Sequence, residues 1–440
     1  QFKLPTDLGK NIDDTLDIQV RLAHRIEQCQ PFRFGQIVGH AFTFEFNCWS
    51  VYPSSTIARM TETKHPPLLS IGPRVRKSPY FDATLRYGAT AFTIYNHTYL
   101  PASYGDNVRD YWSLVNDVTL WDVACQRQVE IAGPDAFEFV QFLTPRDMSR
   151  CEVGQCQYMA LTNQDGGIVN DAILLRVEKN RFWLSPGDGD VLWWAMGVAV
   201  NSGLNVTVSE PDVSPLQLQG PKAPLVARDL FGDWAVDMKY YRLRETELDG
   251  IPLVVSRTGW SGELGYELYL RDGRYGDQLW ERVMAAGEPY WIRAAAPSTI
   301  RSIEGGLLSY VSDITLDDNP YVIGMGRFVD FDQPGEFIGK AALREIAAGG
   351  PSRQLVGIEI DGPALEVPNE EFWDISVGGD VVGRVTRCAH SPRLDRNIGW
   401  ANVPADLAAI GTELVVDSPS GDRRAVVCEA PWFAPQIRIP

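Results

Sequence analysis

The sequence lacks the patterns on which metal and nucleophilic chemistry usually depend. It has only five histidines in 440 residues, and neither an HExxH nor a His-x-His pattern occurs, so no metal site is expected. No P-loop, GxGxxG, GxSxG or kinase-type set is present. No serine or cysteine stands at a spacing that pairs it with a histidine. These absences remove the common signatures of nucleotide binding and covalent hydrolysis, and they leave many other enzymes open.

Basic residues are scarce relative to acidic ones. The 40 Lys and Arg residues are outnumbered by 57 Asp and Glu, which gives a formal net charge of −17. Binding of nucleic acid requires a surplus of Lys and Arg on one face, and an acidic surface is repelled by anionic lipids. No uninterrupted apolar stretch is long enough to span a bilayer. We therefore expect no nucleic-acid partner and no membrane partner.

The cysteines are too few and too scattered for a disulfide framework. There are seven, an odd number, and none forms a CxxC pair. Reduced thiols in a cytoplasmic protein are the expected state.

The length and composition of the chain indicate two or three folded domains. With 45% hydrophobic residues in 440, the chain can bury a sizeable core. Residues 1–69 differ from the rest and are expected to form an N-terminal extension outside the catalytic fold. That segment lacks the charged start, apolar run and cleavage site of a targeting peptide. A stretch rich in Ala, Gly and Pro at 347–352 predicts a boundary between a catalytic region, 70–350, and a C-terminal domain, 351–440.

From about residue 70 the hydrophobic periodicity predicts an α+β fold. Residues 128–132 alternate as a strand and 136–143 repeat as a helix, while 172–177 and 181–185 form a predicted hairpin. Further strands are expected at 216–219, 253–256 and 266–270. After residue 350, short strands separated by turn residues predict a small β-barrel, at 354–360, 381–387, 397–403, 413–417 and 425–429.

Six stretches, in a fixed order, resemble the glycine-cleavage T-protein (aminomethyltransferase) family. Each is weak alone, but six in order are specific. They are DVTLWDVACQRQVEIAG (117–133), GGIVND (166–171), LQLQGP (216–221), where the family has LALQGP, TGWSGELGYE (258–267), IEGGL (303–307), and GRVTR with SP and NIG (383–387, 391–392, 397–399).

Other stretches resemble a sulfonium-demethylase branch of that family more than aminomethyltransferase itself. They are YNHTYLP (95–101), DYW (110–112), LTPRD (143–147), SEPDVSP (209–215) and DDNP (317–320). The resemblance implies a three-lobed, T-protein-like ring that combines folate-binding domains with a C-terminal β-barrel. It also implies a central channel that holds tetrahydrofolate, the acceptor of a one-carbon group.

The resemblance further implies roles for particular residues. Asp171, at the end of its hairpin strand, would be catalytic, lying near N5 of the pterin to orient and accept its proton. Glu267 would bind the donor-rich edge of the pterin. The remaining cofactor-binding candidates are Asn170, Tyr266, Glu304, Arg301 and Arg387. Without the motifs, each of these side chains would more ordinarily cap a turn, pair with a neighbour or face solvent.

A methylated sulfonium or ammonium substrate would need aromatic faces, because a desolvated cation is attracted to them by roughly 0.5–2 kcal/mol each. The candidates for the substrate site are Trp260, Tyr95, Tyr158 and Trp183. Most of the 13 tryptophans must instead belong to the core.

The expected function is a tetrahydrofolate-dependent methyltransferase. It would move a methyl group from a small methylated substrate, such as dimethylsulfoniopropionate, to N5 of tetrahydrofolate. The alternatives are an aminomethyltransferase, a folate-dependent demethylase of methoxy-aromatics or methylated amines, and a non-catalytic folate-binding protein. Assembly into a homo-oligomer is left open.

Overall fold

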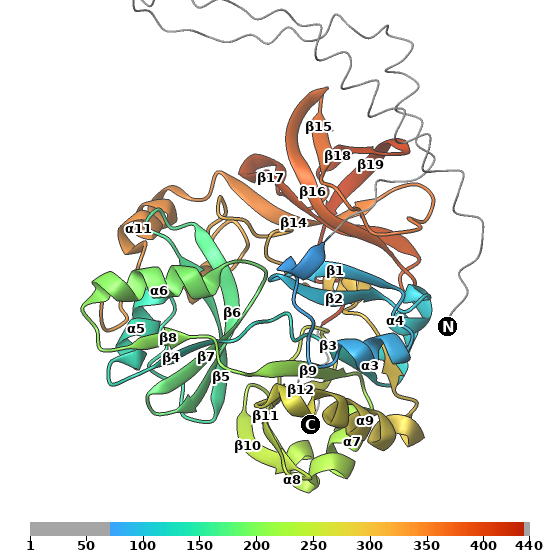
Figure 1. Ribbon diagram of the computed structural model, residues 1–440. Helices are drawn as coiled ribbons and strands as arrows, with labels where there is room; N and C mark the ends of the chain where they lie inside the picture. The colour runs from blue at the N-terminus through green and yellow to red at the C-terminus, as the bar shows by residue number, and fades with distance from the viewer. Residues whose placement is uncertain (1–70, 435–440) are drawn as a thin grey trace, which may run out of the picture. The chain divides into compact units, whose positions relative to one another are not determined.

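The computed structural model describes residues 71–434, and the predicted N-terminal extension lies outside them. This part of the chain is built on a five-stranded sheet, a six-stranded sheet and a closed barrel (Figure 1). None of its helices is long and apolar enough to cross a membrane. The predicted helix and strands all occur, within a residue or two of their expected ends in most cases.

The first lobe is an antiparallel five-stranded sheet with two helices on one face. Its order is β5 (Gln155–Thr162), β6 (Ile168–Glu178), β7 (Arg181–Pro186), β4 (Val129–Ala132) and β8 (Thr207–Ser209). The helices are α5 (Ala136–Leu143) and α6 (Val191–Ser202), which lie beside the sheet in Figure 1. Phe139 of α5 and Leu174 and Leu184 of the sheet are fully buried in its core. Apolar residues on one helix face and one sheet face explain this pairing.

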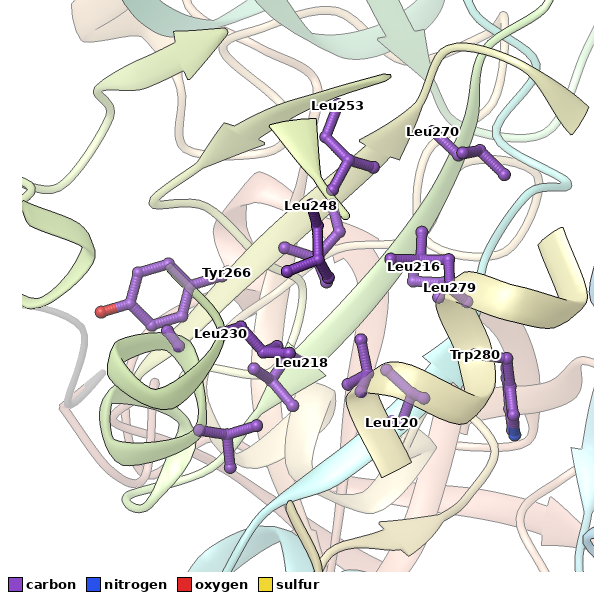
Figure 2. Packing of buried hydrophobic residues seen from close by; sticks show 14 of the residues in the cluster. Leu120, Leu216, Leu218, Leu230, Leu248, Leu253, Tyr266, Leu270, Leu279 and Trp280 are labelled. Carbon is purple, nitrogen blue, oxygen red and sulfur yellow. The ribbon is translucent and has the colours of Figure 1, made fainter. Parts of the chain in front are cut away.

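The second lobe is a six-stranded sheet with helices packed against it. Its order is β10 (Leu243–Leu248), β11 (Ile251–Ser256), β12 (Gly265–Leu270), β9 (Ser214–Gln219), β3 (Thr119–Asp122) and β13 (Arg293–Ala294). The helices that contribute to its core are α3 (Phe81–Arg86), α7 (Ala223–Phe231), α8 (Asp233–Val236) and α9 (Gly276–Gly287). Figure 2 shows this core, in which side chains of the strands meet Leu230 and Trp280 of the helices.

The C-terminal strands close into a six-stranded antiparallel barrel. Its order is β14 (Arg353–Ile360), β17 (Arg396–Pro404), β16 (Asp380–Ser391), β15 (Trp373–Val377), β18 (Glu413–Ser418) and β19 (Gly421–Cys428), with β19 paired back to β14. Strand β15 was not predicted from the sequence. Its Trp373 and Ile375 are buried and Asp374 between them is exposed, which is the alternation of a half-buried strand. Helix α11 (Lys340–Gly349) ends just before the barrel begins.

The remaining elements connect these parts. A hairpin of β1 (Ala91–Tyr95) and β2 (Thr98–Ser103) precedes helix α4 (Asn107–Asn116). The short helix α10 (Thr299–Glu304) contacts β16 and β17 of the barrel. Its N-terminus is capped by Ser298, whose hydroxyl accepts from the backbone N–H of Arg301 at 3.2 Å.

Two glycines make the tight turn that starts strand β6. Gly166 has a φ of +80°, which side chains rarely adopt. A Cβ on Gly167 would lie 2.3 Å from the backbone carbonyl oxygen of Leu316. The GG pair of the GGIVND motif therefore lets the chain pass close to the backbone of Leu316 just before β6 leads to Asp171.

Replacing Gly167 tests this close approach. We expect Gly167→Ala to lower stability by about 1–3 kcal/mol, because the backbone of Leu316 cannot move aside as a flexible side chain can. The matched control is Gly197→Ala in α6, where an added Cβ meets nothing within 4 Å. That control should raise stability by about 0.5–1 kcal/mol. Thermal melting of both variants makes the comparison, and equal melting temperatures would contradict the account.

Candidate functional site

A cavity of about 870 Å³ lies where the two sheets, the first hairpin and the barrel meet. Its walls include Tyr95 of the hairpin, Asp171 of the five-stranded sheet, Glu267 of the six-stranded sheet and Arg387 of the barrel. A volume of this size accommodates a ligand of several hundred daltons. Six of the eleven site residues predicted from the sequence line it: Asp171, Glu267, Arg387, Trp260, Tyr95 and Tyr158.

Asp171 presents a carboxylate to this cavity. The prediction that Asp171 ends its strand is wrong. Asp171 lies near the beginning of β6, which continues to Glu178, and it pairs with Ala160 of β5. Its Oδ2 accepts a hydrogen bond from the Tyr158 hydroxyl at 3.2 Å. Burial raises the pKa of Asp171 to about 6, although the hydrogen bond from Tyr158 acts to lower it. The group can therefore exchange a proton near neutral pH.

Asn170 is placed on the other side of the strand by the alternation of β6. Its side chain is fully buried and does not line the cavity. The amide donates to the carbonyl of Asp188 at 2.8 Å and accepts from the N–H of Gly187 at 2.9 Å. Asn170 thus fixes the loop after β7, whose Gly187 lines the cavity beside Asp171.

The tip of the first hairpin is tied to the same loop. Asn96 and His97 both have positive φ, as a two-residue hairpin turn requires. The Asn96 side chain donates to the carbonyl of Gly187 at 3.0 Å and accepts from Gly189 N–H at 2.7 Å. This attachment holds the adjacent Tyr95 against the cavity.

Glu267 is buried, not directed outward to solvent. Its carboxylate accepts from the Nε2 of Gln217 at 2.9 Å, from the Tyr269 hydroxyl at 3.1 Å and from the Thr258 hydroxyl. Burial raises the pKa of Glu267, and the same three donors oppose that rise. Beside it, the Oε1 of Gln217 is buried and has no hydrogen-bond partner. Both side chains line the cavity.

The packing of Gln219 explains why two of the sequence motifs occur together. Its amide lies under the glycine-rich loop, where a Cβ on Gly259 or Gly265 would come within 2.3 Å of it. The Ser261 hydroxyl donates to its Oε1 at 2.6 Å. The LQLQGP strand and the TGWSGELGYE loop therefore depend on each other for packing, and they place Trp260 and Glu267 at the cavity.

Three of the four predicted substrate aromatics line the cavity. Tyr95, Tyr158 and Trp260 are half-buried there. Trp260 donates its indole N–H to the carbonyl of Leu308 at 3.1 Å. Burial and the carboxylate of Asp171 both raise the pKa of Tyr158, which keeps its hydroxyl protonated as a donor.

Arg387 lines the cavity, but its charge is already paired. The guanidinium contacts Asp313 and donates to the Ser302 hydroxyl at 3.0 Å and to the Leu307 carbonyl at 2.7 Å. Its Cζ also lies 5.7 Å from the centre of the Trp260 ring. These contacts fix the Arg387 guanidinium at the cavity wall, so it is not a solvated loop charge.

Arg301 and Glu304 lie outside the cavity wall, in a buried junction between α10 and its neighbours. Both are 0% exposed. Arg301 donates to Glu263 at 2.6 Å. Glu304 accepts from the Tyr111 hydroxyl at 2.8 Å, from Ser391 at 2.6 Å and from Arg393 at 2.8 Å. The structure therefore does not bring these two side chains to the predicted ligand position, because protein groups surround them.

Tyr266 and Trp183 are also away from the cavity wall. Tyr266 points into the helix-covered core, where its hydroxyl donates to the carbonyl of Ala235 at 3.0 Å (Figure 2). Trp183 is 1% exposed; its N–H donates to Glu130 at 2.9 Å and its ring contacts Tyr269. Strand alternation decides the position of Tyr266, since its neighbour Glu267 takes the opposite face. Trp183 shares a face of β7 with Ser185, which lines the cavity, but it lies two residues farther along the strand.

Several cavity residues were not identified from the sequence. Tyr310 lies in none of the quoted motifs, while Cys125 and Gln217 lie in motifs that did not mark them individually as functional. Only Gln217 carried a signal, because a polar residue interrupts the apolar LALQGP pattern at the position where the family has alanine.

The fold and the site together define a three-part α+β protein with a cavity to which all three parts contribute residues. Comparison with known families matches residues 80–333 to the GCVT N-terminal domain. Residues 353–433 match the glycine cleavage T-protein C-terminal barrel domain.

Individual relatives agree with this match. The chain is 38% identical over 360 residues to dimethylsulfoniopropionate demethylase of Ruegeria pomeroyi, covering 82% of this chain and 98% of the relative. It is 33% identical to an aminomethyltransferase of Shouchella clausii, covering 76% and 91%. Aminomethyltransferase T of Bartonella henselae has a similar fold, with a TM-score of 0.73 at 23% identity, over 82% of this chain and 99% of that structure.

The chain belongs to the glycine-cleavage T-protein family. The predicted family and α+β fold class are confirmed, including the C-terminal barrel. The predicted enzyme class, a tetrahydrofolate-dependent transferase, is confirmed with them.

The pKa of Asp171 can be measured directly by carbon NMR of its carboxyl group, assigned with Asp171→Asn. We expect a midpoint of about 6. Tyr158→Phe should move it higher, because the lost hydrogen bond favours the charged form. Tyr99→Phe, outside the cavity wall, should leave it unchanged. A wild-type midpoint near 3.8, the ordinary value, would contradict the burial of this group.

Proposed function

We propose that this chain demethylates a small sulfonium compound of the dimethylsulfoniopropionate type and transfers the methyl group to tetrahydrofolate in the cytoplasm. The observation that carries the proposal is the single cavity in which Asp171, three aromatic rings and the Glu267–Gln217 acceptor pair meet. The similarity to the demethylase of Ruegeria pomeroyi supports the choice of methyl donor.

The residues present fit tetrahydrofolate. The pterin ring carries several N–H donors, and the cavity offers it the Glu267 carboxylate and the unpartnered Oε1 of Gln217. Arg387 is the only Lys or Arg among the residues that line the cavity in the described part of the chain. Asp313 already balances the charge of Arg387. Arg387 can therefore orient an anionic group of the ligand but cannot fully neutralise its charge.

A methylated cation fits the aromatic part of the same cavity. Tyr95, Tyr158 and Trp260 offer ring faces, which attract a desolvated sulfonium by roughly 0.5–2 kcal/mol each. The Asp171 carboxylate adds a negative charge on the same wall. These groups would bind the cation without a covalent bond.

Tetrahydrofolate supplies the nitrogen nucleophile N5. A carbon–nitrogen bond forms as the carbon–sulfur bond breaks, and the electron pair stays on sulfur, which leaves as a neutral thioether. Such a leaving group needs no acid. Asp171, with a pKa near 6, is ionised at neutral pH and accepts the proton lost from nitrogen. The cavity contributes alignment of the two ligands and exclusion of water.

An anaerobic assay tests this function. Purified protein is incubated with tetrahydrofolate and dimethylsulfoniopropionate, and 5-methyltetrahydrofolate is followed by chromatography. We expect product from wild type and a loss of roughly 10²–10⁴-fold in kcat for Asp171→Asn, which cannot accept the proton. Asp374→Asn, an exposed change in the barrel, serves as the control. Wild-type activity should decline below about pH 6, as Asp171 becomes protonated.

Failure of the assay has distinct meanings. Absence of product would rule out the sulfonium donor, and methylated amines and methoxy-aromatics would then be tried with the same acceptor. Activity that appears only with a lipoyl carrier protein would instead support an aminomethyltransferase, the activity named for the Shouchella clausii relative.

A further inference from the structure

We infer that Gln217 is a second pterin-binding residue, acting with Glu267 to determine how tetrahydrofolate is held. This inference rests on the proposed function. Gln217 lies on β9, directly across from Glu267 on β12. It is 1% exposed and lines the cavity.

The two ends of the Gln217 amide have different environments. Its Nε2 donates to Glu267 at 2.9 Å, whereas its Oε1 is buried and accepts nothing. A buried acceptor without a partner has lost its hydrogen bonds to water and gained none in return, which is unfavourable. A ligand that donates a hydrogen bond here recovers that cost, so the structure is complementary to a donor at this point of the cavity.

The chemistry of the two ligands decides which one supplies the donor. A dimethylsulfonium carboxylate has no N–H or O–H group at neutral pH and cannot satisfy Oε1. The pterin ring of tetrahydrofolate has adjacent donors, the N3–H and the 2-amino group. Glu267 already accepts three protein hydrogen bonds, and a carboxylate has about four acceptor positions. One remaining position on Glu267 and Oε1 of Gln217 therefore form a neighbouring pair of acceptors, matched to two neighbouring donors.

A protein donor does not fill this role. Trp121, across from Gln217 on β3, has an indole N–H that is also unpartnered, but it makes no hydrogen bond to Gln217 and does not line the cavity. The family motif LALQGP has alanine where this chain has Gln217. An alanine at this position would leave Glu267 without the amide donor and would remove the second acceptor.

The test compares folate binding by isothermal titration calorimetry in wild type and Gln217→Met, which has a similar shape and no hydrogen-bonding group. Tetrahydrofolate and an analogue that lacks the 2-amino group are titrated into each protein. We expect Gln217→Met to weaken tetrahydrofolate binding by roughly tenfold or more, and to change binding of the analogue by less than about half as much. Gln354→Met, exposed on the barrel, is the matched control and should bind both folates as wild type does.

Each other outcome overturns the inference in a recognisable way. Equal weakening for both folates would mean that Gln217 acts only on the shape of the site. Unchanged folate binding, with a raised KM for the methyl donor, would assign Gln217 to the substrate. In either case wild type still binds tetrahydrofolate and the proposed function stands. If wild type itself does not bind tetrahydrofolate, the proposed function fails and this inference fails with it. Thermal melting of Gln217→Met establishes that the variant is folded.

Discussion

The arrangement of the site depends on the buried charges around helix α10. Arg301 and Glu304 are fully buried, and Arg387 is nearly so. An uncompensated charge in such a place costs several kcal/mol, so each must keep its partners. Through those partners the helix is bonded to the glycine-rich loop at Glu263 and to the barrel at Ser391. Because the cavity is bordered by these same parts of the chain, its shape follows from this junction.

The cavity combines two environments that suit one reaction. Near Asp171 it has aromatic faces and a carboxylate of raised pKa, which suit a cation and a proton to be removed. Near Glu267 it has neutral and anionic acceptors held by internal hydrogen bonds, which suit a flat ring with N–H donors. Holding both ligands in one cavity would permit direct transfer without an intermediate on the protein. Direct transfer of the methyl group from sulfur to N5 is the central feature of the proposed function.

The secondary structure could be predicted well because it depends on local patterns. The helix of α5 and the strands of the barrel follow from apolar periodicity and turn residues. Asp171 and Glu267 could be selected from the motifs, and the structure does place both at the cavity, where their roles remain proposals.

Which side chains reach the cavity could not be predicted from motifs alone. Tyr266 and Glu267 are adjacent in one motif, yet strand alternation turns only Glu267 toward the cavity. Glu304 lies in the IEGGL motif and Arg301 just before it, and both are held there by buried charge pairing with residues far along the chain. Arg301 and Glu304 are paired with residues 38 and 89 positions away along the chain, so the pairing leaves no local signal in the sequence.

The stereochemistry of transfer tests the central claim most directly. Dimethylsulfoniopropionate with a methyl group made chiral by the three hydrogen isotopes is converted in a single turnover, and the configuration of the methyl group on 5-methyltetrahydrofolate is determined. Direct in-line transfer within one cavity predicts inversion. Cys125 also lines the cavity, and its thiol is held neutral because burial raises its pKa well above the ordinary value. Retention of configuration would mean two successive transfers through such a protein group and would contradict the account.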